Sequence, residues 1–166
     1  MESTIALEAA PPDERDASLA DALTDAYPRV YRALVAFGAQ PHDAADAVQD
    51  AIEYALRRRP RVASPSGWLF VVSVRAWKRD RWRRRLVRPL ETLRGGERFE
   101  RDERIDLLHE LARLTERQRA VVVARYVLGL SQQETADALG ISRGTVAATT
   151  HQATEHLRKR LIGGAT

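Results

Sequence analysis

Apolar residues recur at spacings of three and four along most of the chain, a pattern that predicts helices. The first such stretch runs from Leu19 to Phe37 and should end at Gly38. Pro28 should bend this helix or mark a break in it. A second amphipathic helix should begin at Pro41, because proline suits the first helical position.

A third helix is predicted from Gly67 to about Arg85, with Ser66 as its N-terminal cap. The next stretch, 86–104, contains one proline and a glycine pair without a long period, which is typical of a linker. An amphipathic helix follows from Ile105 to Leu114. The linker therefore separates two groups of helices.

Two capping boxes mark helix starts in the second group: Thr115 with Gln118, and Ser131 with Glu134. The helix that starts at Thr115 should continue until Gly129.

The helix that starts at Ser131 should stop at Gly140, where a left-handed residue is expected. Ser142 can cap the last helix, whose buried stripe would be Val146, Ala153 and Leu157. Two short helices around a tight turn form the unit that places its second helix in a DNA major groove, although an ordinary helical hairpin has the same pattern.

The predicted fold class is all-α, with two small helical domains joined by a flexible linker. The expected boundaries are a disordered tail at 1–17, an N-terminal domain at 18–85, the linker at 86–104 and a C-terminal domain at 105–166.

Charge is distributed unevenly along the chain. Lys and Arg number 27 against 23 Asp and Glu, a formal net charge of only +4. The charged residues through Asp25 are acidic except for Arg15, whereas Arg75 to Arg88 is densely basic. A polyanion would therefore be contacted at particular places rather than everywhere.

The second helix carries an acidic and amide stripe opposite its apolar face. Its members recur at three and four and are Asp43, Asp46, Gln49, Asp50 and Glu53. The stripe is either a solvated face or a docking surface for a basic partner. No histidine or thiolate joins these carboxylates, so we expect no metal site here.

Basic residues, with aromatic residues among them, are frequent from the end of the second helix onward. Arginines crowd Arg57–Arg61, and Trp77 and Trp82 lie within the basic stretch Arg75–Arg85. This mixture suits a nucleic-acid strand, because cations contact phosphates and rings stack on bases. Alternatively these tryptophans anchor the core beneath arginine side chains, the interpretation favoured for Trp68.

The sequence lacks the residues that several functional classes require. The chain has no cysteine, which excludes disulfides and thiolate chemistry. No phosphate-binding glycine loop or Ser/His/Asp set is apparent, so no catalysis and no cofactor are expected. No apolar stretch approaches the roughly 20 residues that span a bilayer, and the N-terminus lacks a signal-peptide pattern, which predicts a cytoplasmic protein without a membrane partner.

Three motifs occur in order: AADAVQDAIEYAL, SGWLFVVSVRAWKRDRWRRR and LTERQRAVVVARYVLGLSQQETADALGISRGTVAATTHQA. Together they resemble an extracytoplasmic-function sigma factor of the bacterial sigma-70 family, over about Leu19 to Leu161. The third motif alone also occurs in other helix-turn-helix regulators, but the combination is specific.

The resemblance implies a subunit that binds the clamp and flap of core RNA polymerase and contacts promoter DNA in double- and single-stranded form. The residues implied for the polymerase clamp are Asp43, Asp46, Gln49 and Asp50. Those implied for the minus-10 element and strand opening are Arg58, Arg61, Arg75, Lys78, Arg79, Arg81 and Trp82. Those implied for the minus-35 element are Arg143, Thr145, Thr149, His151 and Gln152. An anti-sigma partner is also expected from the resemblance, without a marked docking face.

The sequence departs from the family pattern at two places. A run that is often basic in relatives reads Ala147, Ala148, Thr149, Thr150 here, which leaves Arg143 as the main basic candidate for base recognition. Relatives often have asparagine where Arg75 stands, and tryptophans at 77 and 82 are unusual, so the preferred opening sequence should differ.

Two other functions remain open from the sequence. A stand-alone two-domain helix-turn-helix regulator would not need the acidic stripe, whereas a sigma factor uses it for the polymerase. A non-specific single-strand binder would show affinity without promoter preference.

Overall fold

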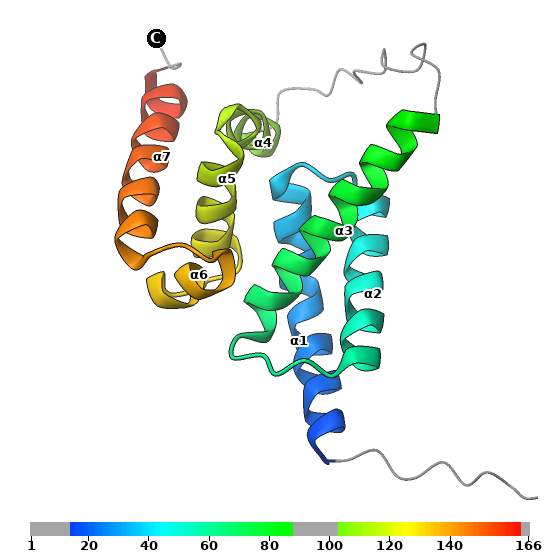
Figure 1. The fold of residues 1–166 in the computed structure, drawn as a ribbon. Helices are drawn as coiled ribbons and strands as arrows, with labels where there is room; N and C mark the ends of the chain where they lie inside the picture. The colour runs from blue at the N-terminus through cyan, green and yellow to red at the C-terminus, as the bar shows by residue number, and fades with distance from the viewer. Residues whose placement is uncertain (1–13, 88–102, 164–166) are drawn as a thin grey trace, which may run out of the picture.

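The computed structural model describes residues 14–87 and 103–163, and every regular element within them is helical (Figure 1). In chain order the elements are α1 (Glu14–Phe37), α2 (Pro41–Arg58), α3 (Pro65–Val87), α4 (Glu103–Arg113), α5 (Glu116–Val122), the π-helical turn η2 (Val123–Val127), α6 (Gln132–Leu139) and α7 (Arg143–Gly163). The all-α prediction is confirmed. Residues 1–13 of the tail expected at 1–17 lie outside the described residues. Residues 88–102 of the linker predicted at 86–104 also lie outside them.

Helices α1, α2 and α3 form the N-terminal bundle. Its core is built around Phe37 at the end of α1, whose ring contacts Phe70 and Trp77 edge-on at centroid distances of 6.0 and 6.1 Å. Trp77 is only 7% exposed, so it belongs to the core and is not available to a DNA strand. This burial decides the alternative that the sequence left open for Trp77.

Two helix boundaries differ from their predictions. Helix α1 already begins at Glu14, and it passes through Pro28 without a break. Proline has no amide hydrogen, so one backbone carbonyl lacks its helical partner. Pro28 is exposed, and water can therefore reach that carbonyl. Helix α3 begins at Pro65, and its cap is Ser64, whose Oγ accepts from the Gly67 amide at 3.3 Å. Ser66 lies inside the helix, because the helix begins two residues earlier than predicted.

Helix α6 of the C-terminal unit begins and ends at the residues that the sequence predicts. The Ser131 and Glu134 capping box is formed in both directions, with backbone-to-side-chain distances of 3.1 and 2.7 Å. Gly140 ends α6 at φ 66° in the left-handed region, as predicted. Ser142 Oγ accepts from the Thr145 amide at 3.1 Å and caps α7.

The helix that precedes α6 is not α-helical along its whole length. The Thr115 and Gln118 capping box begins α5 as predicted, and Gly129 adopts φ +72°. The expected continuous helix, however, changes to π-helical bonding over Val123–Val127. Along α7, the predicted stripe is buried: Val146 and Ala153 are 0% exposed and Leu157 is 9% exposed.

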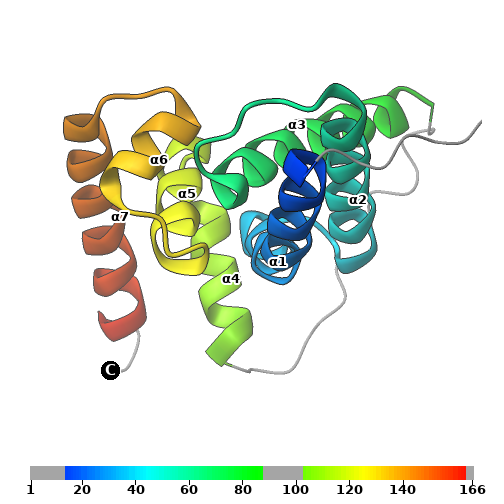
Figure 2. The same ribbon diagram turned by 90° about the horizontal axis from the view of Figure 1, so that it is seen from below.

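The two helical units pack against each other. One buried cluster includes Phe37, Leu69 and Trp77 from the N-terminal bundle together with Val123 and Leu130 from the C-terminal unit. Figures 1 and 2 show α6 beside the start of α3, whereas α2 lies on the side of the bundle away from the C-terminal unit. The sequence pattern predicted two units but not this contact between them.

Candidate polymerase and nucleic-acid interfaces

The acidic stripe of α2 lies along one groove between α2 and α3. The groove has a volume of about 280 Å³, and its polar lining includes the four predicted residues Asp43, Asp46, Gln49 and Asp50. Asp46, Gln49 and Asp50 are exposed, as expected for helical positions facing away from a buried alanine and valine stripe. The four side chains are therefore brought together on an accessible surface.

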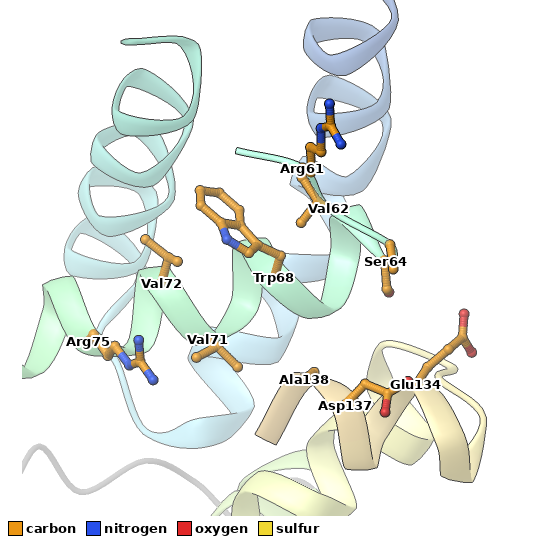
Figure 3. Close-up of a pocket in the computed structure, with 11 residues that line it drawn as sticks. Arg61, Val62, Ser64, Trp68, Val71, Val72, Arg75, Glu134, Asp137 and Ala138 are labelled. Atoms are coloured by element: carbon orange, nitrogen blue, oxygen red, sulfur yellow. The ribbon is translucent and has the colours of Figure 1, made fainter. Parts of the chain in front are cut away.

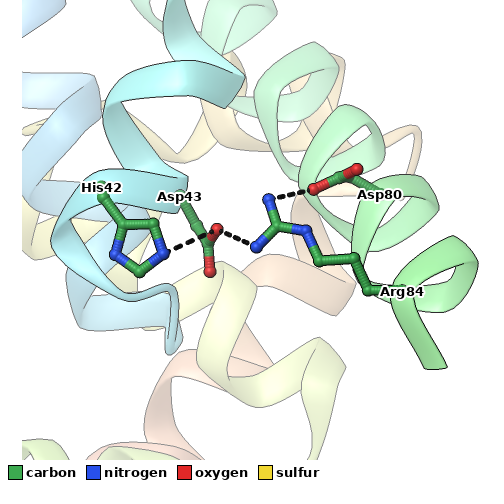
Figure 4. A network of polar contacts seen from close by, with 4 residues as sticks. All are labelled: His42, Asp43, Asp80 and Arg84. Carbon is green, nitrogen blue, oxygen red and sulfur yellow. Dashed lines mark hydrogen bonds and ion pairs between the residues drawn. The ribbon is translucent and has the colours of Figure 1, made fainter. Parts of the chain in front are cut away.

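Asp43 differs from the other three because it already has a cationic partner. Arg84 Nη1 on α3 donates to Asp43 Oδ1 at 2.7 Å, and Nε2 of His42 lies 3.2 Å from the same oxygen (Figure 4). Arg84 also pairs with Asp80 one turn earlier on α3. The hydrogen bond to Asp43 raises the pKa of the Arg84 guanidinium above its ordinary value. With its side chain only 17% exposed, Asp43 helps to join α2 to α3.

The same α2–α3 cleft becomes basic towards the C-terminal end of α2. A cavity of about 480 Å³ is lined there by three arginines, Arg57, Arg75 and Arg79, together with Asp50 and Tyr54. Three guanidinium groups around one cavity favour an anionic occupant such as a phosphate backbone. The cleft thus presents one acidic end and one basic end.

Tyr54 is a candidate that the sequence reasoning missed. Its side chain is 45% exposed and stacks on Trp68 with ring centroids 6.4 Å apart and an interplanar angle of 15°. An exposed ring beside arginines can stack on an unpaired base. A signal was available, because Tyr54 follows Asp50 by four residues and therefore lies on the same face of the helix.

The other predicted strand-contacting residues occupy three different environments. Arg61 and Arg75 line a cavity of about 310 Å³ next to Trp68 (Figure 3). Lys78 forms an ion pair with Glu116 of the C-terminal unit. Arg81 lies over the Trp77 ring at 5.5 Å.

Arg58, Arg79 and Trp82 are exposed, with Trp82 at 63%. Trp82 thus remains a candidate for stacking on a base, unlike Trp77. The predicted set therefore extends along α3 rather than forming one compact pocket.

Helix α7 divides its predicted DNA contacts between two faces. Arg143, His151 and Gln152 are exposed, and Thr145 is partly buried with its hydroxyl 2.8 Å from that of Ser142. Thr149 is only 8% exposed, because it follows Val146 by three residues on the face that packs inward. Its side chain cannot reach a DNA groove from there, so Thr149 is removed from the predicted set.

Neither a metal site nor a membrane-spanning helix is found in the described part of the chain. Within residues 14–87 and 103–163, no three His, Asp or Glu side chains are grouped so that they could hold a metal ion. None of the helices described is both long and apolar enough to cross a bilayer.

Curated relatives match one segment of the chain. The RNA polymerase sigma-E factor of Streptomyces coelicolor is 46% identical over 56 residues, which is 34% of this chain and 32% of that protein. The factor of the same name from Streptomyces avermitilis is 47% identical over 55 residues, 33% of this chain and 31% of that protein. The matched segment thus spans about a third of the length of these relatives.

Two solved structures share the fold over most of the chain. The sigma factor RpoE of Bartonella quintana, solved with the anti-sigma factor NepR, has a TM-score of 0.65 and 21% identity and covers 87% of this chain and 96% of that one. CnrH in complex with the cytosolic domain of CnrY has a TM-score of 0.61 and 24% identity, over 92% of this chain and 97% of that one. At these identities the similarity concerns the fold.

Family sequence models assign both helical units. The model described as Sigma-70 region 2 matches residues 23–87, which contain the acidic stripe and the arginine-lined cavity. The model described as Sigma-70, region 4 matches residues 104–157, which contain the capped helix pair α6 and α7. With both regions present and in order, the chain belongs to the sigma-70 family, in the extracytoplasmic-function type that its sequence motifs resemble.

Proposed function

We propose that this chain binds core RNA polymerase, directs it to promoters and holds the opened DNA, while the polymerase performs the chemistry. The observation that carries the proposal is the α2–α3 cleft, which presents an exposed acidic groove at one end and an arginine-lined cavity at the other. A dimeric repressor needs only a DNA-reading helix. A polymerase subunit that opens DNA needs one surface for a protein and another for a strand.

The acidic groove would receive a basic surface of the polymerase clamp. Asp46, Gln49 and Asp50 are exposed and offer carboxylate and amide oxygens to arginine or lysine side chains. Asp43 would contribute less, because its carboxylate is already bonded to Arg84. Complementary charge of this kind accelerates association and weakens as salt rises.

The basic end of the cleft would hold the separated strand. Arg75 and Arg79 would neutralise phosphates, and Tyr54 and Trp82 would offer ring faces to unpaired bases. Arg58 and Arg61 continue this basic surface into the loop after α2.

Helix α7 would read the upstream element in duplex form. Arg143 at its start can form paired hydrogen bonds with a guanine, whereas His151 and Gln152 offer further polar contacts. Ala147 and Ala148 are exposed on the same helix and can contact only methyl groups or sugar. Recognition would then rely on few direct contacts and on DNA shape.

Two further properties belong to the same proposal. The chain would act in the cytoplasm, where polymerase and promoters are found. An anti-sigma protein would restrain it, because the similar sigma factor RpoE of Bartonella quintana was solved in complex with the anti-sigma factor NepR.

Run-off transcription tests the proposal. Purified core polymerase would be incubated with sheared DNA fragments, with or without this protein, and the 5′ ends of the transcripts would be mapped. We expect the protein to produce discrete new start sites that share two upstream sequence elements. Start sites that do not change when the protein is added, together with tight binding of the protein alone to a palindromic duplex, would favour a stand-alone regulator.

A further inference from the structure

One arginine of α3 lies in the acidic groove between α2 and α3. Among the described residues, the charged groups that line this groove are the carboxylates of Asp43, Asp46, Asp50 and Asp80 and the guanidinium of Arg84. Asp46 and Asp50 are exposed, whereas Asp43 and Asp80 are both paired with Arg84. The groove therefore already holds one cation of the kind that the proposed function assigns to the polymerase clamp.

The Arg84 guanidinium uses different nitrogens for its two partners (Figure 4). Nη1 donates to Asp43 Oδ1 on α2 at 2.7 Å, and Nη2 pairs with Asp80 Oδ2 one turn earlier on α3. Arg84 and Asp80 lie four residues apart on the same helix, so their pair can persist when the bond to Asp43 is broken. Release of Asp43 would therefore leave Arg84 with a carboxylate partner.

Exchange of the cation on Asp43 requires no unfolding. The Arg84 side chain is 46% exposed, so it can turn away from Asp43 into water. Exposed ion pairs contribute little net stability, because water solvates both partners and ordering two long side chains costs entropy. A cation on another protein can thus replace Arg84 on Asp43.

The alternative role for Arg84 is to fix the shape of the groove by joining α2 to α3. These helices are already packed together below the surface, since Ala47 and Val48 of α2 belong to the same buried cluster as Phe70 and Trp77 of α3. The two roles predict opposite results when Arg84 is removed. A fixing role predicts weaker polymerase binding, whereas an occupying role predicts stronger binding.

We propose that Arg84 is an internal occupant of the polymerase-binding groove, and that a cationic side chain of the polymerase clamp replaces it on Asp43. The inference rests on the proposed function. In the free chain Arg84 masks Asp43, which leaves Asp46, Gln49 and Asp50 for the first contact. Polymerase affinity is thereby held below the value that the complete acidic groove would give.

A double-mutant cycle between Arg84 and Asp43 tests the inference. Core polymerase is titrated into the fluorescently labelled whole chain carrying Arg84→Gln, Asp43→Asn or both, and thermal unfolding is measured in parallel. Arg83→Gln is the matched control, because Arg83 is an exposed neighbour on α3 that does not line the groove. Its substitution removes the same charge.

Arg84→Gln should bind core polymerase about threefold more tightly than the unsubstituted protein, a factor within the range measured for exposed ion pairs. Arg83→Gln should bind almost as the unsubstituted protein does, because an exposed charge outside the groove is screened by salt. Asp43→Asn should weaken binding by less than about twofold when Arg84 is present and by about threefold when Arg84 has been replaced. Only in the second case is Asp43 available to the polymerase.

Three results would overturn the inference: unchanged or weaker binding by Arg84→Gln, equal tightening by Arg84→Gln and Arg83→Gln, or the same effect of Asp43→Asn in both backgrounds. Weaker binding would make Arg84 a positioning residue of the groove, and equal tightening would reduce its effect to net charge. Failure of the unsubstituted protein to bind core polymerase would instead contradict the proposed function, so the two failures are distinguishable.

Discussion

Charge reversal at Asp50 is the sharpest test of the polymerase-binding groove. Asp50 is exposed on α2, and within the part of the chain that the structure describes no ion pair to it is formed, so Asp50→Arg breaks no such contact. A unit charge pair about 4 Å apart is worth about 4 kcal/mol at an effective dielectric of 20, whereas fully exposed pairs measure about 0.2–1 kcal/mol. Asp50 is exposed but lines the groove, so the expected loss lies between these limits, at about 2 kcal/mol or about 30-fold in affinity.

The assay is a titration of core polymerase into fluorescently labelled protein, with thermal unfolding measured in parallel. Asp21→Arg is the matched control, because Asp21 is an exposed acid on α1 and its reversal changes the net charge equally. Asp50→Arg should bind about 30-fold more weakly with an unchanged unfolding temperature, while Asp21→Arg should bind almost normally. Equal weakening by both variants, or by neither, would refute the groove as the docking site.

Three other predictions follow from single residues. Arg143→Ala should weaken binding of the upstream duplex by about 1–3 kcal/mol and leave bubble templates unaffected, whereas Arg79→Ala should show the reverse pattern; equal losses on both templates would contradict the division of labour. Val146→Ala removes two fully buried methyl groups and should lower the free energy of unfolding by about 2 kcal/mol in urea titrations; an unchanged midpoint would mean that α7 is not packed as described. The hydrogen bond from the Ser131 amide lowers the pKa of Glu134 below its ordinary value. The stabilising contribution of the carboxylate is therefore complete above the ordinary pKa and is lost as the pH falls through the lower pKa of the folded state. Glu134→Gln should flatten this part of the stability profile below pH 4.5, and an identical acid limb in both proteins would argue against the cap.

Features determined by a few neighbouring residues could be predicted from the sequence. The Ser131 and Glu134 box and the left-handed Gly140 each depend on one helical turn, and both occur as expected. The acidic stripe of α2 could likewise be predicted, since residues at spacings of three and four share a face whatever the helix packs against. The same reasoning gave the buried position of Val146.

Features that depend on which helix faces meet could not be predicted in this way. Threonine is a residue type that can contact DNA, but Thr149 lies on the same inward face of the helix as Val146. Trp77 lies in a basic stretch, yet it packs edge-on against Phe37 from another helix. The contact between Arg119 and Phe37 joins residues 82 positions apart and leaves no local pattern in the chain.

The packing of the two helical units against each other is another long-range feature of this kind. Sequence motifs assigned surfaces to a protein partner, a single strand and a duplex, but they carried no information on which surfaces are covered together. Gly67 illustrates the difficulty: its role is to allow α6 to approach α3, and in the sequence it appears only as a residue near a helix start.

Permanganate reactivity of thymines on a linear duplex promoter, obtained from the mapped start sites, tests the central claim most directly. Reactive thymines should appear just upstream of the start site only when this protein and core polymerase are both present, and Asp50→Arg should strongly reduce their reactivity. Reactivity with the protein alone, or with core polymerase in its absence, would contradict a role in polymerase-dependent promoter opening.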